Sequence, residues 1–359
     1  MKEIPDPATD AGKLYKHALH VARQHNHNKE FAKPVSDALS TEYKQLGEQV
    51  LSKLRAKLGG NLRYMVTGGA ATSVKVLQFF EDIGVPVTEL YGLTETSPVM
   101  GISAMDWSGR RLGTVGKPLC NVQVRIIDPE TLQERPANTD GEVTCAAPSV
   151  MRGYRKNPTA TAETFYEHDG KRFFRSGDIG QMVDGQFLKI TGRIKEQFKL
   201  DNGKFVVPAP LEDALCRCLL VAQSFLVGAN KSHTVALIVP DMVEVRNWVN
   251  QHKDGKTKEL VSLLPTPEQL ADASINTIPL FTHPVFTAEV SAQLTEAGHG
   301  LKSYERPALW TAILHPFTPE NHQLTPKMSL RRQNILAKYQ PLIDEMYEGK
   351  IGIKLSKSK

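Results

Sequence analysis

Residues 91–98 carry side chains whose types and spacing suggest chemistry. The segment reads Tyr-Gly-Leu-Thr-Glu-Thr-Ser-Pro and follows a short apolar stretch typical of a parallel strand. A loop at the carboxyl end of such a strand faces the ligand crevice of an α/β sheet. There Glu95 could ligate Mg²⁺, and Thr94 could donate a hydrogen bond to a phosphate oxygen. In the alternative, the loop is only polar and Thr94 or Thr96 caps a short helix. The pattern leaves both interpretations open.

A second segment, residues 174–180, places an acidic side chain directly after a glycine. It reads Phe-Arg-Ser-Gly-Asp-Ile-Gly, and its acidic residue is Asp178. One carboxylate can accept hydrogen bonds from both hydroxyls of a ribose, as it does in dinucleotide-binding folds. The alternative is a turn aspartate that bonds its own backbone.

A third segment, residues 191–196, reads Thr-Gly-Arg-Ile-Lys-Glu and joins a glycine-punctuated region to the rest of the chain. Arg193 could reach a sugar or a phosphate. Lys195 could be a pivot whose dihedral angles change when two domains move. Without further evidence, a solvated run of charges would explain the segment equally well.

Histidines and cysteines do not indicate a metal site. A helical pattern near the amino terminus contains the four histidines His17, His20, His25 and His27. No carboxylate or cysteine shares their face at ligand spacing, so we favour a solvated basic face over a metal site. The four cysteines, which contain no CxxC pair, are Cys120, Cys145, Cys216 and Cys218. They are predicted to be free, buried thiols in a reducing compartment.

The elements that must position these residues begin with helices and a βαβ unit. Residues 11–58 predict two or three helices, broken near residues 26–28 and at Pro34. A strand over 62–67, a helix over 74–83 and a strand over 85–91 then follow. This order predicts two neighbouring strands of a parallel sheet, with a glycine loop after the first.

The rest of the chain changes texture twice. Short β-branched runs with frequent turns between residues 113 and 192 predict an antiparallel barrel or a curled sheet. A smaller α+β domain is expected after Arg193. Its predicted elements are a helix over 210–220, strands over 224–228, 234–239 and 308–314, a partly helical insertion over 251–303, and a helix over 329–339 that stops near Pro341.

Composition bounds the class of protein. The 359 residues suffice for two or three domains, and 40% hydrophobic with 23% charged residues is typical of a globular protein. A net charge of +5 suits an anionic ligand but is too small to indicate a nucleic-acid partner. The amino terminus lacks a signal-peptide pattern, and no apolar run approaches the roughly 20 residues that span a bilayer. We therefore expect a soluble or peripherally membrane-associated protein of unassigned, intracellular compartment.

Taken together, several ordered motifs resemble the adenylate-forming superfamily and, within it, the long-chain fatty acyl-CoA synthetases. The motifs are residues 51–70 (Leu-Ser-Lys-Leu-Arg-Ala-Lys-Leu-Gly-Gly-Asn-Leu-Arg-Tyr-Met-Val-Thr-Gly-Gly-Ala), 91–98, 176–178, 192–193 and 201–208. The resemblance extends from about Leu14 to Tyr347. It implies an α/β fold in which residues 1–192 form the latter portion of a large AMP-binding domain, with βαβ layers and a β-barrel-like subdomain. Residues 193–195 would be the hinge, 196–350 a mobile α+β domain and 351–359 a tail.

The resemblance also implies roles for individual residues. Those expected to bind ATP or AMP are Gly68, Gly69, Ala70, Tyr91, Gly92, Thr94, Asp178 and Arg193. Within this set, the glycine loop would border adenine and the acyl group, Tyr91 would lie against adenine, and Asp178 would bind ribose. Glu95 would hold Mg²⁺, and Lys195 would occupy the hinge. Gly203 and Lys204 would lie in a loop on the CoA side.

The implied reaction has two steps. A fatty acid carboxylate attacks the α-phosphorus of ATP to give an acyl-adenylate and diphosphate, and CoA thiolate then displaces AMP. The implied ligands are ATP, Mg²⁺ and CoA. Most of the catalysis in the first step would come from positioning and charge neutralisation.

Two departures from the family pattern bear on activity. The Ser/Thr/Gly-rich phosphate loop ending in Pro-Lys-Gly occurs nowhere in the sequence and would lie before residue 1, so we expect an incomplete chain and a separate or missing N-terminal half. The family's C-terminal lysine aligns with Ser329. If the segment is extended, Lys327 keeps the same face and could substitute. Otherwise Lys327 is a surface lysine beside a helix capped by Ser329.

The sequence therefore predicts a long-chain fatty acyl-CoA synthetase whose chain alone makes little acyl-CoA. One alternative is a non-catalytic AMP- or CoA-binding pseudoenzyme. The other is a ligase that transfers the acyl group to the pantetheine of a carrier protein.

Overall fold

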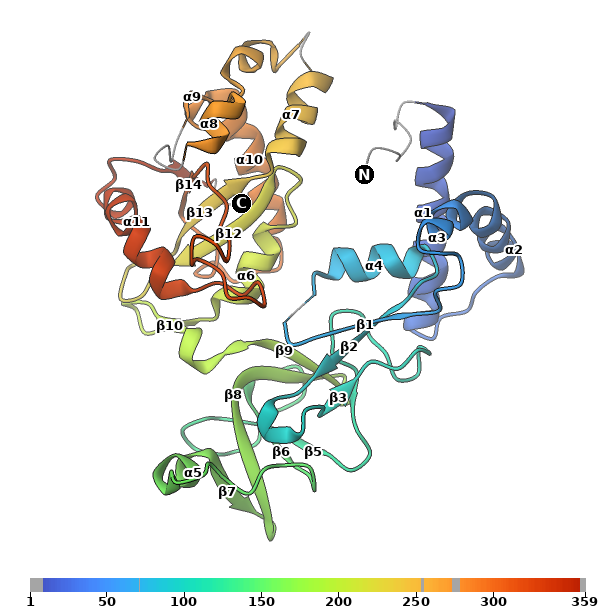
Figure 1. The fold of residues 1–359 in the computed structure, drawn as a ribbon, viewed down its shortest axis with the longest axis vertical. Coiled ribbons are helices and arrows are strands. Elements are labelled where there is room, and N and C mark those ends of the chain that lie inside the picture. Colours follow the sequence, from blue (N-terminus) through green and yellow to red (C-terminus); the bar gives the residue numbers. More distant parts are fainter. Residues whose placement is uncertain (1–8, 71, 253–254, 273–277, 356–359) are drawn as a thin grey trace. The chain divides into compact units, whose positions relative to one another are not determined.

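The computed structural model describes residues 9–70, 72–252, 255–272 and 278–355 (Figure 1). The chain divides into two compact units, Met1–Thr191 and Gly192–Lys359, called here the first and second units. A boundary after residue 192 and a hinge at 193–195 were predicted. Hinge motion stays a prediction. Each unit is described by itself.

A helical layer opens the first unit. Its members are α1 (Asp10–Glu30), α2 (Asp37–Leu46), the π-helical turn Gly47–Leu51 and α3 (Ser52–Lys57). The predicted break near residues 26–28 is wrong, because α1 runs unbroken to Glu30. The Asn26 side chain is buried inside the helix and donates a hydrogen bond to the Glu81 carbonyl at 3.2 Å. A tertiary partner thus satisfies a side chain that would otherwise favour a turn.

The predicted βαβ unit is confirmed. Strand β1 (Met65–Gly68) pairs in parallel with β2 (Val87–Tyr91), and α4 (Val74–Asp82) connects them. The short strands β3 (Gly101–Ile102) and β4 (Lys117–Pro118) extend the sheet in the order β1-β2-β3-β4. The carboxyl ends of β1 and β2 therefore lie side by side and lead into residues 69–70 and 92–98.

An open antiparallel sheet completes the first unit, so the expected barrel-like closure is wrong. Its members are β5 (Gln123–Ile127), β6 (Gly141–Ala146), β7 (Phe165–His168), β8 (Lys171–Val183) and β9 (Phe187–Arg193), with α5 (Pro158–Thr164) before β7. The order is β5-β6-β8-β7, and β9 also pairs with β8. The 13-residue β8 accommodates two partners, while no described pairing joins β5 to the opposite edge.

The second unit is an α/β sandwich around the sheet β12-β13-β14-β15. The strands are β12 (Val221–Val227), β13 (Val235–Pro240), β14 (Leu309–Ala312) and β15 (Ile353–Lys354), and a separate hairpin pairs β10 (Phe198–Lys199) with β11 (Phe205–Val206). The helices are the 3₁₀ turn Ile194–Glu196, α6 (Pro208–Leu215), α7 (Met242–Gln251), the 3₁₀ segment Lys258–Leu263, α8 (Pro267–Ala271), α9 (Pro279–Thr282), α10 (Pro284–Ala297) and α11 (Arg332–Tyr347).

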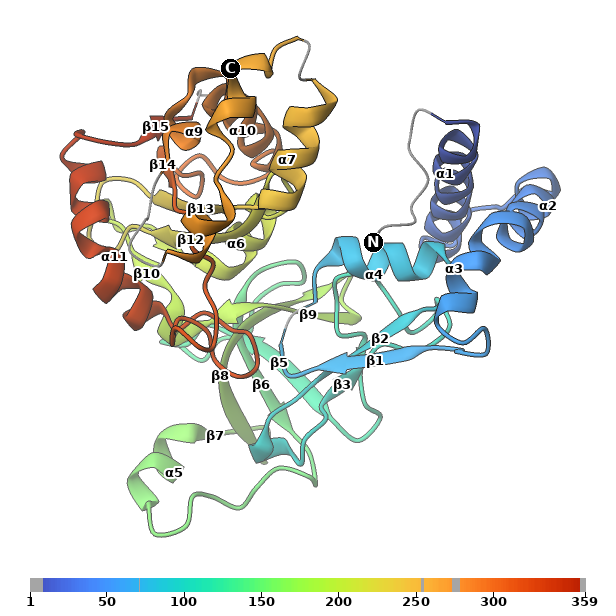
Figure 2. The same ribbon diagram turned by 45° about the horizontal axis from the view of Figure 1, so that its top comes forward.

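Alternation along β13 divides the core of this unit into two layers. Ala236 and Ile238 belong to a buried cluster with α6, α7 and α10, whereas Val235, Leu237 and Val239 belong to one with α11. Figure 2 shows these helices on opposite sides of the sheet. Successive strand residues point to opposite faces, so both faces require a helical cover.

The last helix differs from its prediction at both ends. It begins at Arg332 rather than Ser329, because an antiparallel bridge between Leu324 and Leu330 keeps the preceding residues out of the helix. It also continues through Pro341 to Tyr347. Burial of Ile343 and Met346 against the sheet offsets the hydrogen bond that proline removes.

Three further expectations concern side chains and membranes. The four cysteines are free thiols, but Cys120 is exposed, contrary to the expectation that all are buried. The described residues of the 251–303 insertion are largely helical. Within the described ranges, no helix combines the length and apolarity needed to cross a membrane.

Candidate active site

Two predicted nucleotide-binding segments meet in the first unit. The Tyr91 hydroxyl, at the end of β2, donates a hydrogen bond to Oδ2 of Asp178 on β8 at 2.7 Å, although the residues are 87 positions apart. Only 3% of Asp178 is exposed. Burial, and secondarily the Asp178 charge, raises the pKa of Tyr91, so the phenol remains a hydrogen-bond donor. Tyr91 therefore holds the Asp178 carboxylate in a defined position.

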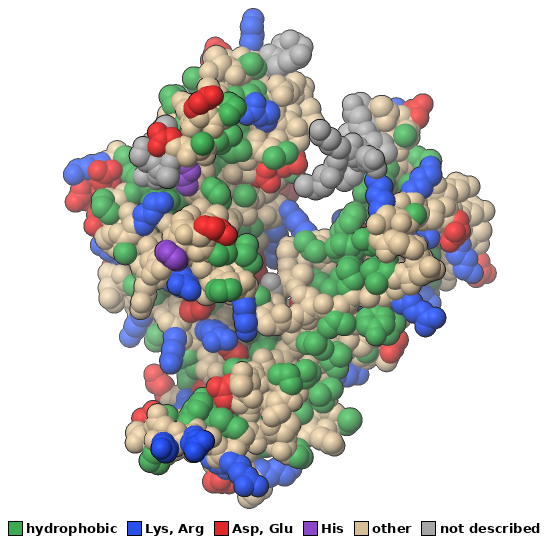
Figure 3. Space-filling model, viewed as in Figure 1, with side chains coloured by type: hydrophobic (Ala, Val, Ile, Leu, Met, Phe, Trp, Pro, Cys, Tyr) green, Lys and Arg blue, Asp and Glu red, His purple; other side chains and the backbone are tan. Residues whose placement is uncertain are grey.

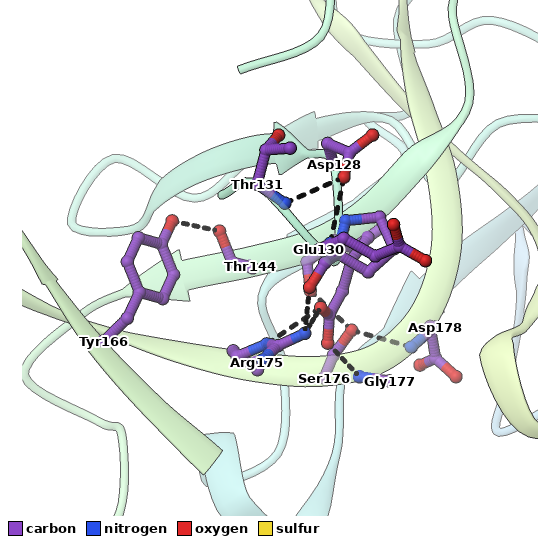
Figure 4. Close-up of polar contacts among 12 residues, drawn as sticks. Asp128, Glu130, Thr131, Thr144, Tyr166, Arg175, Ser176, Gly177 and Asp178 are labelled. Atoms are coloured by element: carbon purple, nitrogen blue, oxygen red, sulfur yellow. Dashed lines mark hydrogen bonds and ion pairs between the residues drawn. The ribbon is translucent and has the colours of Figure 1, made fainter. Parts of the chain in front are cut away.

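Asp178 lies on a bulge of β8. The β6–β8 register shifts between Glu142 and Thr144, so residues 176–178 project from the ladder. The Ser176 hydroxyl donates to the Val143 carbonyl at 2.6 Å and accepts from the Asp178 amide at 3.0 Å. Figure 4 shows this turn, with the Asp178 carboxylate directed away from Arg175. The bulge aims the acidic side chain while its backbone stays bonded.

Two buried-side contacts hold the other half of the bulge. The Gly177 amide donates to Oε1 of Glu142 at 3.2 Å, and Arg175 donates to Oε2 of the same carboxylate at 2.6 and 2.9 Å. Gly177 has φ +69°, a left-handed conformation that glycine adopts without steric cost. The Ser-Gly-Asp order therefore suits the bulge geometry, not only the expected turn.

The glycine loop after β1 lies beside Tyr91. Gly68 is in register with Leu90, and a Cβ at Gly68 would lie 3.1 Å from both Cβ and the carbonyl oxygen of Leu90. Gly69 has φ +82°. Ala70 follows it and ends this described range. Close strand approach and a left-handed turn thus explain both glycines.

Residues 92–98 form a compact loop. A Cβ at Gly92 would lie 1.5 Å from the Pro98 carbonyl oxygen, so the chain folds back at a position that only glycine can occupy. Thr96 is buried, and its hydroxyl accepts from the Leu93 amide at 3.0 Å. Thr96 thus stabilises the loop, as the capping alternative proposed, whereas Thr94 is exposed.

Glu95 lies half-buried in this loop. The Tyr154 hydroxyl donates to its Oε1 at 2.9 Å, a contact that the sequence analysis missed because nothing in the spacing links residues 95 and 154. Among the described residues, no group of three or more His, Cys, Asp or Glu side chains could hold a metal alone. One carboxylate nevertheless fits Mg²⁺, which is commonly held by one or two carboxylates together with substrate phosphates.

Glu89 is a second residue that the sequence analysis missed. It precedes Tyr91 by two positions on β2, so both side chains lie on the same face of the sheet. Glu89 is buried and accepts a hydrogen bond from the Thr72 backbone amide. Burial raises the pKa of Glu89 to about 7. A carboxyl group inside an otherwise apolar strand was the signal that could have identified it.

The histidines expected on a solvated face have specific neighbours. His17 Nε2 lies 2.9 Å from Oε1 of Glu42, and the ring of His25 stacks on Tyr43 at 4.1 Å. The expectation that no carboxylate shares the histidine face is therefore wrong for His17, since α2 supplies Glu42. These contacts give the helix a packing role.

The second unit carries the remaining predicted residues on exposed segments. Arg193 and Lys195 are exposed at the end of β9 and in the following 3₁₀ turn. Gly203 has φ +84° in the β10–β11 turn, and the Lys204 ammonium lies 4.7 Å from the centre of the Tyr304 ring. Cation–π contact thus gives Lys204 a neighbour inside its own unit.

Lys327 lies at the tip of a tight turn, not in an extended segment. The Thr325 amide donates to the Ser329 carbonyl at 2.8 Å, and Met328 has φ +64°. The two-residue argument for equivalent faces therefore does not hold. Ser329 is not the helix cap either, because Arg331 has that position. Lys327 is exposed, and its role stays a prediction.

Comparisons with known proteins agree with these motifs. Residues 16–155 match the model of the AMP-binding enzyme family. The long-chain-fatty-acid–CoA ligase FadD15 of Mycobacterium bovis is 34% identical over 83% of this chain and 44% of its own length. The long-chain-fatty-acid–[acyl-carrier-protein] ligase AEE15 of Arabidopsis thaliana is 31% identical over 79% of this chain and 35% of its own.

A solved structure shows the same fold. It is the A domain of a carboxylic acid reductase from Segniliparus rugosus, in complex with AMP and a co-purified carboxylic acid. The match has a TM-score of 0.58 at 24% identity and covers 94% of this chain and 46% of that one. The chain thus spans less than half the length of each relative described. From its ordered motifs, family match and fold, the chain belongs to the adenylate-forming, AMP-binding enzyme family and is of the fatty acyl-CoA synthetase type.

Proposed function

We propose that this chain contributes the adenosine-binding side of a long-chain fatty acyl-CoA synthetase, which converts fatty acid, ATP and CoA to acyl-CoA, AMP and diphosphate. The observation that carries the proposal is the 2.7 Å hydrogen bond between Tyr91 and the buried Asp178. It joins the segment proposed to border adenine to the segment proposed to bind ribose. Relatives named as fatty acid ligases support the same substrate class.

Asp178 would accept hydrogen bonds from the ribose hydroxyls. Its Oδ2 already accepts from Tyr91, and the bulge fixes the backbone beneath it, so little side-chain entropy remains to be lost on binding. Gly68, Gly69 and Ala70 would allow the backbone to approach the base and the acyl group closely. Precise placement of the α-phosphate near the attacking carboxylate is the expected catalytic gain.

Thr94 and Glu95 would act on the phosphate side. Exposed Thr94 could donate to an α-phosphate oxygen, and Glu95, oriented by Tyr154, would supply one carboxylate ligand to Mg²⁺. When bound, Mg²⁺ would neutralise phosphate charge. Arg193 would add a contact to ribose or phosphate.

The second unit would serve the thiol-transfer step. Lys195 would be the hinge, and the turn bearing Gly203 and Lys204 would face the pantetheine arm of CoA. Lys327 could still bridge the carboxylate and ATP, since a tight turn leaves it exposed. The same residues would suit an acyl-carrier protein as acceptor, and the relative AEE15 is named for that acceptor.

Titration of the purified chain with AMP by isothermal calorimetry tests the adenosine site. We expect saturable binding that weakens by about 10- to 100-fold in Asp178→Asn, because two hydrogen bonds to a charged acceptor are lost or weakened. Glu163→Gln, an exposed carboxylate on α5, is the control and should bind normally. Equal affinity in Asp178→Asn would refute the ribose role.

A second assay tests the reaction. The chain is incubated with ATP, Mg²⁺, palmitate and either CoA or a pantetheinylated carrier protein. Little product is expected from the chain alone, since the sequence contains no Pro-Lys-Gly phosphate loop. Rapid thioester formation would contradict that expectation, and the preferred thiol would identify the acceptor. AMP binding without any thioester, even after addition of the remaining part of a relative, would favour the non-catalytic alternative.

A further inference from the structure

Strand β1 is an edge strand with features of a central one. It lies at the end of the order β1-β2-β3-β4, so among the described residues only β2 pairs with it. The Met65 amide donates to the Pro86 carbonyl at 3.0 Å, which directs that residue toward β2. Alternate residues direct their backbone groups to opposite sides, so Val66 and Gly68 present theirs to the open edge.

Apolar side chains are exposed on both faces of this edge. On one face lie Leu62, Tyr64 and Val66, which are 40%, 44% and 54% exposed. Met65 points to the other face and packs in the same cluster as Phe79 and Phe80 of α4. On that helix, Val74 and Val76 are 46% and 45% exposed. We call these five exposed residues the β1 edge patch.

The space-filling view shows hydrophobic side chains gathered where α4 and β1 lie (Figure 3). Folded monomers usually protect an edge strand with charges, proline or a covering loop. The β1 edge patch instead contains no charged residue, although Arg63 and Lys75 flank its members. A parallel strand with apolar residues on both faces is typical of the interior of a sheet.

We propose that the β1 edge patch binds a strand of a separate polypeptide, one that corresponds to the part of the ligase relatives outside their match to this chain. FadD15 is matched over only 44% of its length, so more than half of such an enzyme has no counterpart here. The partner would add a strand to β1 through Val66 and Gly68 and cover both apolar faces. Main-chain pairing of this kind tolerates sequence differences, because the backbone supplies most of the hydrogen bonds.

A second copy of this chain is the competing occupant. Two β1 strands could pair across a two-fold axis, but each is only four residues long. Such a contact would leave the α4 side of the patch dependent on whatever the short strands bring with them. The length difference from the relatives instead favours a different polypeptide.

Co-expression tests the proposal. The tagged probe is the part of M. bovis FadD15 that lies outside its match to this chain, and recovery of the chain with the probe is measured. We expect a complex in which amide hydrogen exchange of residues 65–68 is slowed at least tenfold. The complex should be at least tenfold weaker with Val66→Lys, which places a charge on the pairing strand.

Val243→Lys is the matched control, because Val243 is 64% exposed on α7 of the second unit. It should leave complex formation unchanged, and neither variant should shift the thermal midpoint of the isolated chain appreciably. Failure to recover a complex, or recovery that is insensitive to Val66→Lys, overturns the proposal. A concentration-dependent dimer of the chain alone with protected residues 65–68 would assign the edge to a second copy and also overturn it. None of these readouts depends on AMP binding or catalysis.

Discussion

The predicted nucleotide-binding residues of the first unit and the predicted reactive residues of the second are supported in opposite ways. Asp178 and Tyr91 are held by hydrogen bonds between buried or half-buried side chains on different sheets. Gly203 and Lys327 occupy tight, exposed turns whose hydrogen bonds are local. The first arrangement fixes a geometry before a ligand arrives, whereas the second leaves side chains accessible.

This difference matches what the two steps would require. A ribose site gains affinity when its acceptor is already oriented. A domain that presents different residues at successive steps needs them exposed, with rigidity supplied underneath. In the second unit that rigidity comes from Arg332 of α11, which donates to both carboxylate oxygens of the buried Glu212 of α6 at 2.8 and 3.0 Å.

The largest expected effect tests that underlying support. Replacing Arg332 by Met should destabilise the second unit by about 3 kcal/mol or more, because Glu212 is left buried without its cation. Amide hydrogen exchange of α6 and α11 measures this separately from the first unit. Arg331→Met, at the exposed neighbouring position, should change little. If Arg332→Met is equally mild, the turns of the second unit do not depend on this ion pair.

Glu89 allows a pH test of the buried side of the comparison. Its pKa of about 7 exceeds the ordinary value of 4.5, so the folded state retains a proton that the unfolded state releases. The stability contribution is complete below pH 4.5 and is lost as pH rises through 7, with a total of about 3 kcal/mol.

Glu89→Gln should therefore flatten the stability of the first unit between pH 4.5 and 7, as measured by hydrogen exchange at several pH values. Glu163→Gln on exposed α5 should preserve the slope. An unchanged slope in Glu89→Gln would show that the carboxyl group is hydrated rather than buried.

Two tyrosines compare a buried hydroxyl with a more accessible one. Tyr91→Phe leaves Asp178 without its donor and should cost about 1–2 kcal/mol of first-unit stability, with a several-fold loss in AMP affinity. Tyr154→Phe removes the contact to Glu95, but Tyr154 is 39% exposed, so less than about 0.5 kcal/mol is expected. Equal effects in thermal unfolding and calorimetry would remove the proposed distinction.

The smallest effect is expected at Lys327. Because the side chain is exposed on a turn, Lys327→Met should leave stability within about 0.5 kcal/mol and AMP affinity within about twofold. If it bridges the carboxylate and ATP, only acyl-adenylate formation by the assembled enzyme should fall. A tenfold loss of AMP affinity would instead place Lys327 in the binding of the product nucleotide.

Local patterns predicted much of this protein. The alternation of strand, glycine loop, helix and strand was sufficient for the βαβ unit around β1 and β2, because hydrophobic period and turn residues act over a few positions. The motif order identified the family and nominated Tyr91, Asp178 and Glu95. Gly92 and Gly69 are explained by local backbone demands that sequence also reveals.

Only the tertiary structure decided what depends on distant contacts. The 87-residue separation of Tyr91 and Asp178, the burial of Glu89 and the Tyr154–Glu95 contact follow from strand register, which no local pattern encodes. The open sheet in place of a barrel, and the passage of α11 through Pro341, were likewise set by packing. Sequence thus determined which side chains are available for chemistry, and tertiary burial and pairing determined which of them are held in place.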